Sequence, residues 1–273
     1  MRNNGPLDSA AGLGTSDHAC WAYHEDDGHL VPGLEFLDDG LRNGARVAYS
    51  ADKPMEELRA DVAPLEDVDA LLERGALQLF ELDSLYGVGK PVDAAGQLAT
   101  YQAALEDALA CGHAGLRVLA EGTTMVENPD MWDAHLRWET CIDSYMSGRP
   151  LAAMCCYDAR KVDPQIMGDV ACAHPLGGGE AGLAPFRLFG NDGSLGVAGE
   201  IDAFSVEGFR RLLSLAAVPG EDLALDLTEL GFIDHRGVSA IFEQARRTAA
   251  RGRRLSVREA PLVYERICEL IGV

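Results

Sequence analysis

The sequence has few basic residues for its length. It carries 23 Lys and Arg against 44 Asp and Glu, a formal charge of −21 over 273 residues. So acidic a surface repels nucleic-acid phosphates and anionic lipid headgroups, and we expect no direct binding to nucleic acid or to a membrane. The excess is uneven: residues 186–273 hold 11 Arg against 13 acidic residues, so nearly all of the net charge lies in the first 185 residues.

Long apolar runs are also missing. No run approaches the roughly 18 residues that a membrane span needs. The first 18 residues lack the apolar centre of a signal peptide, so we expect a cytoplasmic protein. The seven cysteines are an odd number spread from Cys20 to Cys268, a pattern typical of reduced thiols rather than of a disulfide framework.

A phosphate-binding loop is absent as well. Such a loop needs glycines, then Lys and a hydroxyl residue, between a strand and a helix. The segment "DKPMEE" at residues 52–57 has no glycine. Gly89-Lys90 comes closer, but Pro91 replaces the hydroxyl residue and Ser84 stands where the first glycine belongs. We therefore expect no nucleotide hydrolysis, no enzymatic activity and no cofactor.

Strand-like runs alternate with helical patterns through the first part of the chain. The runs cover residues 45–51, 76–82, 116–122 and 151–158. This alternation predicts an α/β domain with a mainly parallel sheet and helices on its faces. The Gly- and Pro-rich segment that follows is typical of a linker. We predict an N-terminal tail at 1–15, a first domain at 16–176, a linker at 177–185 and a second domain at 186–273.

The second domain has its own pattern. "FRLFG" and "SLGVAGEI" flank the turn "NDG" and predict a hairpin. A helix at about 205–217, the strand "LALDLT", a helix at about 236–251, the strand "RLSVREA" and a helix from Pro261 follow. The order predicts a small α/β module.

This order, with "GEID" at 199–202, "LDLTELGFID" at 225–234 and a helix-opening Gly237, resembles the STAS family of anti-sigma factor antagonists. The resemblance implies a partner that is an anti-sigma factor of the serine-kinase type, and regulation of transcription by partner switching. It also implies that the partner-binding residues are Asp202, Asp234, His235, Arg236, Gly237 and Ser239.

The usual phosphorylation switch of that family is missing. In the family, the residue that matches His235 is usually a Ser or Thr that a partner kinase phosphorylates. We therefore expect a docking surface that is not gated by phosphate at that position, unless Ser239 is a substitute acceptor. The simpler alternative is that Asp234 only caps the helix and His235 is a solvated residue of its first turn.

The first domain carries four short motifs: His18-Ala-Cys20, Glu121-Gly122, Trp138-Glu139 and Cys156-Tyr157-Asp158. Together they resemble the MEDS sensory domain, although Thr123-Thr124 before Met125 departs from its pattern. The resemblance implies a RecA-like α/β fold and a sensory role.

Polar residues follow the strand runs, where ligands gather in parallel sheets: Ser50, Asp52, Glu121, Tyr157 and Asp158. We predict a site for a small organic ligand there, with Trp132 and Trp138 as an apolar wall. The candidate ligand-binding residues are His18, Cys20, Tyr23, Glu121, Trp138, Glu139 and Tyr157. The alternatives are that the tryptophans are core residues and that Glu121 pairs with Arg117 or Arg137.

Metal binding is a weaker possibility. His18-x-Cys20 and Cys172-x-His174 offer four ligands for a tetrahedral zinc ion if the ends of the domain meet. Packed thiols are the simpler interpretation, and we expect no metal site. Neighbouring Cys155 and Cys156 should point to opposite sides of a strand and cannot act together.

The prediction as a whole is a non-enzymatic bacterial regulator with a small-ligand sensor and a STAS output. A ligand-binding or scaffold protein that self-associates through its STAS part is the alternative from another class. A metal or redox sensor acting through Cys20 is the third.

Overall fold

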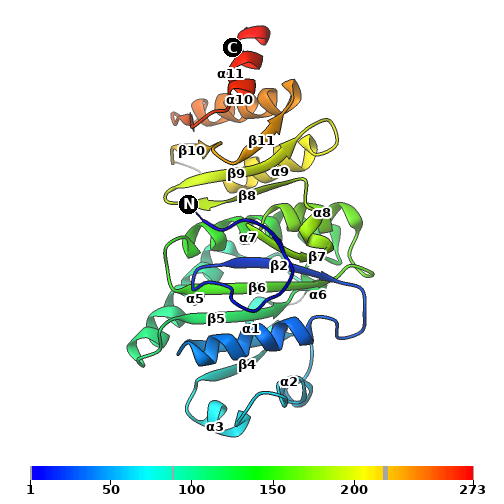
Figure 1. Cartoon of the computed structure of the whole chain (residues 1–273), viewed down its shortest axis with the longest axis vertical. Coiled ribbons are helices and arrows are strands. Elements are labelled where there is room, and N and C mark those ends of the chain that lie inside the picture. Colours follow the sequence, from blue (N-terminus) through cyan, green and yellow to red (C-terminus); the bar gives the residue numbers. More distant parts are fainter. Residues whose placement is uncertain (1, 88, 218–220, 273) are drawn as a thin grey trace.

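The computed structural model describes residues 2–87, 89–217 and 221–272. Two sheets lie one above the other along the long axis, with the C-terminal helix at one end (Figure 1). The first sheet has seven strands in the order β1-β7-β2-β6-β5-β3-β4, and every pairing in it is parallel. The predicted α/β class with a parallel N-terminal sheet is confirmed.

The four strands predicted in this sheet are present as β3 (Arg46–Ala51), β4 (Leu77–Glu81), β5 (Leu116–Glu121) and β6 (Leu151–Asp158). Three strands were not predicted: β1 (Gly5–Leu7), β2 (His18–Tyr23) and β7 (Leu176–Gly179). The helices that connect the strands are α1 (Leu30–Arg42), α2 (Met55–Asp61), α3 (Val68–Glu73), α4 (Leu82–Tyr86), α5 (Ala94–Ala110), α6 (Thr123–Val126), α7 (Trp132–Met146) and α8 (Pro164–Cys172).

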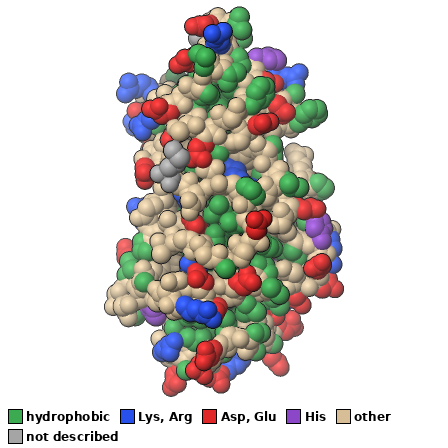
Figure 2. All heavy atoms as spheres, viewed as in Figure 1, with side chains coloured by type: hydrophobic (Ala, Val, Ile, Leu, Met, Phe, Trp, Pro, Cys, Tyr) green, Lys and Arg blue, Asp and Glu red, His purple; other side chains and the backbone are tan. Residues whose placement is uncertain are grey.

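Helices cover both faces of this sheet. Phe36 of α1 is buried in one cluster with Tyr49 and Leu119, whereas Leu105 of α5 is buried in another with Val118. Both faces of the central strands are therefore covered, which is why β3 and β5 are buried along their whole length. Acidic side chains stand out in Figure 2 at the end of the molecule formed by α2 and α3, in keeping with the charge of this part of the sequence.

The segments predicted as a tail and a linker contain strands of the first sheet. Residues 5–7 form β1, which pairs with β7, and β7 in turn pairs with β2. The segment 177–185 thus begins inside the sheet and continues as a short 3-10 helix, Glu180–Leu183. A strand made of glycines gives no apolar signal in the sequence, yet its backbone is buried. A Cβ added at Gly178 would lie 2.0 Å from the ring of Trp21, so this backbone packs directly against a neighbouring side chain.

The second sheet is small and mixed. β8 (Phe186–Asn191) and β9 (Ser194–Ile201) form the predicted antiparallel hairpin. β10 (Leu223–Asp226) and β11 (Leu230–Ile233) both pair with β9 in parallel, and β12 (Leu255–Arg258) pairs with β10. Three helices complete this part: α9 (Val206–Ala216), α10 (His235–Ala249) and α11 (Leu262–Ile271).

The two sheets share one apolar core. Leu136 of α7 and Val170 of α8 belong to the same buried cluster as Phe186 of β8 and Phe209 of α9. Ion pairs from Arg211 to Asp133 and Asp169 lie beside this core. No helix of the described ranges is both long enough and apolar enough to cross a membrane.

Candidate functional site

The predicted ligand-binding residues do not share one pocket. Because side chains alternate along a strand, His18 and Cys20 of β2 face α7 and α8, whereas Tyr23 lies on the α1 face of the sheet. Glu121 accepts a hydrogen bond from Tyr23 Oη at 3.0 Å and therefore belongs with Tyr23. The structure divides the predicted set between the two faces of the sheet.

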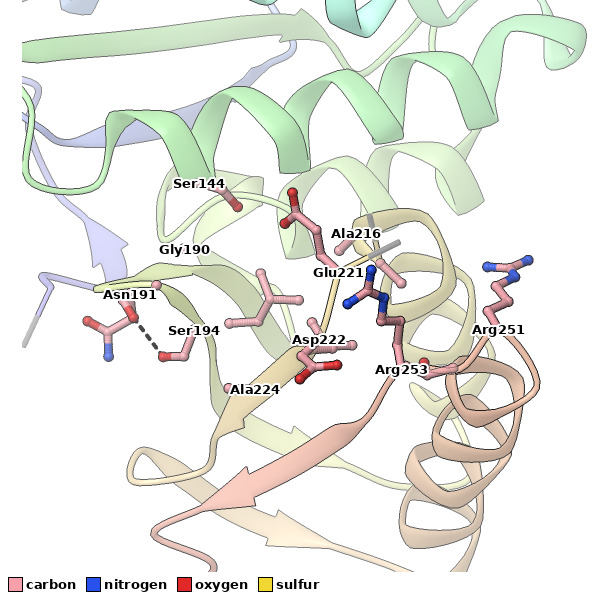
Figure 3. A pocket seen from close by; sticks show the side chains of 15 residues that line it. Ser144, Gly190, Asn191, Ser194, Ala216, Glu221, Asp222, Ala224, Arg251 and Arg253 are labelled. Carbon is pink, nitrogen blue, oxygen red and sulfur yellow. Dashed lines mark hydrogen bonds between the residues drawn. The ribbon is translucent and has the colours of Figure 1, made fainter. Parts of the chain in front are cut away.

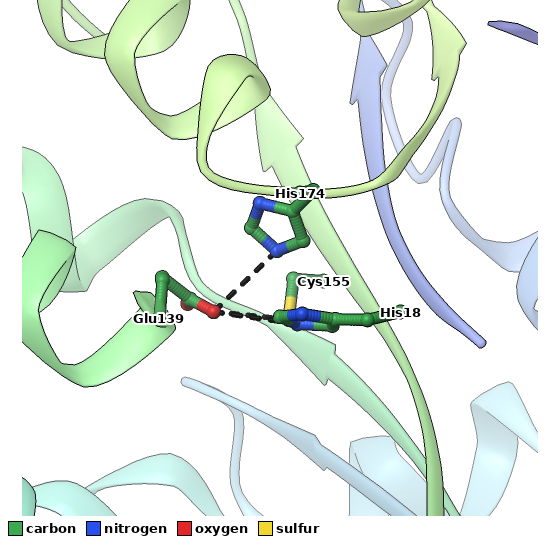
Figure 4. A group of neighbouring side chains, drawn as sticks. All are labelled: His18, Glu139, Cys155 and His174. Atoms are coloured by element: carbon green, nitrogen blue, oxygen red, sulfur yellow. Dashed lines mark hydrogen bonds and ion pairs between the residues drawn. The ribbon is translucent and has the colours of Figure 1, made fainter. Parts of the chain in front are cut away.

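One group on the α7 face brings together His18 of β2, Glu139 of α7, Cys155 of β6 and His174, which follows α8 (Figure 4). One donor atom from each residue lies within 4.8 Å of the other three. Glu139 Oε2 is 3.4 Å from Nε2 of both histidines. Cys155 Sγ is 3.6 Å from His18 Nε2 and 4.0 Å from Glu139 Oε2. We call these four residues the His-Glu-Cys cluster.

The remaining polar atoms of the cluster have partners that hold each side chain in place. His18 Nδ1 lies 3.0 Å from Asp143 Oδ1. His174 Nδ1 lies 2.8 Å from the carbonyl oxygen of Val170. Glu139 Oε1 accepts a hydrogen bond from Tyr157 Oη at 3.1 Å. The atoms that face the centre of the cluster are therefore His18 Nε2, His174 Nε2, Glu139 Oε2 and Cys155 Sγ.

Burial and charge oppose each other in this cluster. Burial acts to raise the pKa of Glu139, but His174, His135 and His18 around the carboxylate hold that pKa well below its usual range. Burial also lowers the pKa of His174 to about 3. For His18, the neighbouring Asp143 and Glu139 outweigh burial and raise the pKa. The environment therefore favours an ionised Glu139 beside a neutral His174.

A small cavity adjoins the cluster. His18, Glu139 and Cys155 line it together with six small or aliphatic residues and five rings, those of Tyr86, Tyr101, His135, Trp138 and Tyr157. Its volume of about 20 Å³ is room for roughly one water molecule. Trp138 does line this cavity, but Trp132 does not: its indole N–H donates to the carbonyl of Val126, and Arg211 lies over its ring.

Both arginine partners suggested for Glu121 are wrong. Arg117 pairs with Asp39, and Arg137 donates to the carbonyl of Leu215. Glu121 instead accepts from Tyr23 and Thr123. Burial raises its pKa, although these hydrogen bonds oppose the shift.

Two of the four residues considered as zinc ligands lie together in the structure. The structure does bring His18 and His174 together, with ring centroids 4.1 Å apart. The group of donor atoms that converge with them among the described residues includes Glu139 and Cys155, not Cys20 and Cys172. Alternation along β6 puts Cys155 on the face opposite Cys156, and this was the signal that could have found Cys155 once β2 was placed beside β6.

The C-terminal candidates gather at one end of the second sheet. The Asp234 carboxylate accepts from the backbone N–H groups of Arg236 and Gly237, so it is the N-cap of α10. Asp202, at the end of the paired strand β9, accepts in the same way from Phe204 and Ser205. The end of β9 and the start of α10 are joined by a hydrogen bond from Asp234 N to the carbonyl of Ile201.

The remaining candidates at this end differ in exposure. His235 and Arg236 are exposed, Gly237 is buried, and Ser239 is half-buried with its hydroxyl donating to the carbonyl of His235. A Cβ at Gly237 would meet Ile233 at 2.6 Å, which explains why the helix opens with glycine there. Phe204 is 95% exposed and Phe232 is 43% exposed nearby. We call Asp202, Phe204, Phe232, Asp234, His235 and Arg236 the α10 surface.

A hollow of about 210 Å³ lies between α7 and the second sheet (Figure 3). Its lining includes Ser144, Leu195 and Asp222, with Arg251 and Arg253 at the rim. It lies where β9, β10 and β12 begin, at the end of the sheet opposite the α10 surface. None of the predicted site residues lines it.

Comparison with protein-family models finds two domains. Residues 17–175 match MEDS, described as the MEthanogen/methylotroph, DcmR Sensory domain, and residues 186–273 match the family described as Mlab, STAS domain. A search of curated proteins found no match. The two matches indicate a sensory or signalling protein of two domains. The chain belongs to the MEDS family and continues into a STAS domain, which confirms the predicted fusion.

Proposed function

We propose that this protein is a non-enzymatic regulator in which the MEDS domain controls a partner-binding STAS domain. The partner is an anti-sigma factor of the serine-kinase type, and transcription changes through partner switching. The MEDS domain responds to a small ligand at or beside the cavity next to the His-Glu-Cys cluster. Because the cavity is small, the ligand either has very few heavy atoms or enters when the surrounding side chains move.

The observation that carries this proposal is the position of Asp143. Its carboxylate lies 3.0 Å from His18 Nδ1 in the sensory domain and accepts from the backbone N–H of Gly190, in β8 of the STAS domain, at 2.6 Å. Arg2 donates both to this carboxylate and to the carbonyl of Gly190. A movement of His18 would therefore be transmitted to β8 by the Asp143 side chain. β8 pairs with β9, and β9 ends at the α10 surface.

The α10 surface supports the choice of a protein partner. An exposed aromatic residue beside an exposed Arg is typical of the anchors that dominate protein interfaces. Phe204 is almost fully exposed in this chain, so contact with a partner would remove most of its ring from water.

Reversal of charge at Arg236 is expected to weaken partner binding at least about tenfold, because close charges at an interface contribute strongly to affinity. The partner is first recovered from a lysate of the native cells by pull-down and identified by mass spectrometry. Titration calorimetry then compares the natural protein with Arg236→Glu.

The matched control is Arg247→Glu, at the far end of the same helix. It should bind the partner as the natural protein does. Equal losses of affinity in the two variants would argue against the α10 surface as the partner-binding site.

Persistent self-association with no kinase-type partner would favour the scaffold alternative, for which the exposed Leu262 and Leu270 of α11 offer an apolar contact.

The recovered kinase and ATP should place no phosphate on residues 234–239, and the complex should persist. In the double variant His235→Ser, Arg236→Ser a hydroxyl returns to the helix N-terminus. Phosphate there should weaken the complex by about 1–3 kcal/mol, roughly tenfold to a hundredfold, through like-charge repulsion and desolvation. Phosphopeptide mapping and calorimetry measure both effects. Phosphate on Ser239 of the natural protein would mean that the switch was moved along the helix.

A further inference from the structure

The His-Glu-Cys cluster has the spacing of a metal site. Around a four-coordinate zinc ion, two N or O ligands lie about 3.3 Å apart, and an S ligand lies about 3.6 Å from an N ligand. The corresponding separations here are 3.4 Å for both His–Glu pairs and 3.6 Å for His18 with Cys155. The separation of Cys155 from Glu139, 4.0 Å, is slightly longer. All four donor atoms lie within 4.8 Å of one another, so side-chain movements of about 1 Å would bring them to the separations of a tetrahedral site.

The hydrogen bonds around the cluster leave lone pairs directed at its centre. His174 Nδ1 faces a carbonyl oxygen, which can only accept, so Nδ1 carries the hydrogen. In the neutral ring the lone pair is then on Nε2, a fully buried atom without a hydrogen-bond partner. That atom faces the carboxylate oxygen of Glu139 at 3.4 Å. Two lone pairs that face each other in a buried site repel, unless a cation lies between them.

His18 has the same kind of outer contact. Its Nδ1 faces the carboxylate of Asp143, and its Nε2 faces both Glu139 and Cys155. A carboxylate or carbonyl behind each ligating histidine is the usual outer shell of a metal site, because it fixes the ring and makes the ligand more basic. Here Asp143 and the Val170 carbonyl have that position, and Tyr157 holds the far oxygen of Glu139.

We propose that His18, Glu139, Cys155 and His174 bind one divalent transition-metal ion of the zinc class. Imidazole and thiolate donors suit such ions, whereas Mg²⁺ and Ca²⁺ prefer oxygen ligands. The Cys155 thiol loses its proton to solvent when the ion binds. With four protein ligands, the ion joins β2, β6, α7 and the turn after α8. This inference needs no partner, so it stands apart from the proposed partner switching.

The test uses the full chain, stripped with a chelator and titrated with Co²⁺ in place of Zn²⁺. We expect one equivalent to bind, with a thiolate-to-cobalt absorption band and the intense visible bands of tetrahedral cobalt, and Zn²⁺ should displace it. Cys155→Ser should abolish the thiolate band and weaken binding by more than about 100-fold, beyond the loss typical of an outer-shell change.

Cys156→Ser is the matched control, because this neighbouring thiol lies on the opposite face of β6. It should keep both the band and the affinity. Tyr157→Phe should keep the band and weaken binding by about 10-fold, since it removes the outer hydrogen bond to Glu139 and the contact with His135 Nε2, but none of the four ligands. Circular dichroism verifies that each variant is folded. The proposal fails if the natural chain gives no thiolate band with Co²⁺, a result that depends on no variant, or if Cys155→Ser and Cys156→Ser behave alike.

Discussion

Asp143→Ala is expected to lower the free energy of unfolding by about 3–5 kcal/mol, the usual cost of removing one member of a buried charged group. The side chain is buried and accepts from Arg2 and from the backbone of Gly190, and it lies against His18 Nδ1. Its loss leaves the Gly190 N–H and the imidazole Nδ1 without this acceptor, and it leaves the guanidinium of Arg2 with backbone carbonyls but no carboxylate. Urea denaturation of the full chain, with a chelator present throughout, measures the effect.

Asp133→Ala is the control for this result. Asp133 lies on the same helix and also contacts the STAS domain, through Arg211, but its side chain is 69% exposed. An exposed ion pair contributes about 0–1 kcal/mol, so the loss should be small. If both variants lowered the free energy of unfolding by a similar amount, Asp143 would contribute no more to the contact between the domains than an exposed ion pair does.

Gly177→Ala is expected to destabilise the protein by about 2–3 kcal/mol, the upper part of the range for overpacking a buried position. Its added Cβ would lie 2.2 Å from the carbonyl oxygen of Ala181 and 2.9 Å from a guanidinium nitrogen of Arg187. Backbone atoms cannot rotate away, so β7 or the 3-10 helix after it must shift. The same urea denaturation measures the change.

Gly168→Ala provides the comparison, because Gly168 lies inside α8 and an added Cβ there meets nothing within 4 Å. Alanine should stabilise the helix by about 0.5–1 kcal/mol. If 177–185 were a linker, Gly177→Ala would also be neutral or stabilising, since alanine restricts the unfolded chain. A stabilising result at Gly177 would therefore contradict the packed strand.

The sequence predicted those strands that have apolar side chains. "ARVAYSA" and "LRVLAEG" are buried on both faces and carry a continuous apolar signal, and they became β3 and β5. β2 was not predicted because its sequence, HACWAY, begins with a polar His, contains two alanines and has none of the Val, Ile or Thr residues typical of strands. β7 was mistaken for a linker because "LGGG" has almost no side chains, and its stability comes from backbone pairing with β1 and β2.

The candidate site was predicted only in part, because β2 was not predicted. His18 and His174 could be paired from the suggestion that the ends of the domain meet. The identity of the other two converging residues depends on which strands are neighbours, because β2 beside β6 aligns Cys20 with Cys155 and places His18 near α7. Strand order depends on contacts between residues that are distant in the sequence. Because β2 was not predicted, its neighbours in the sheet could not be predicted either. The helix cap at Asp234 depends only on adjacent residues, and it is present as the sequence suggested.

The position of β2 has a consequence for how the chain folds during synthesis. β2 is complete by residue 23, but both of its neighbours come much later, β6 at 151–158 and β7 at 176–179. Contacts this distant in sequence slow folding, because the intervening loop must close before they form. β2 therefore stays unpaired during synthesis until almost the whole sensory domain has been made. Its unpaired edges need protection from aggregation during that interval.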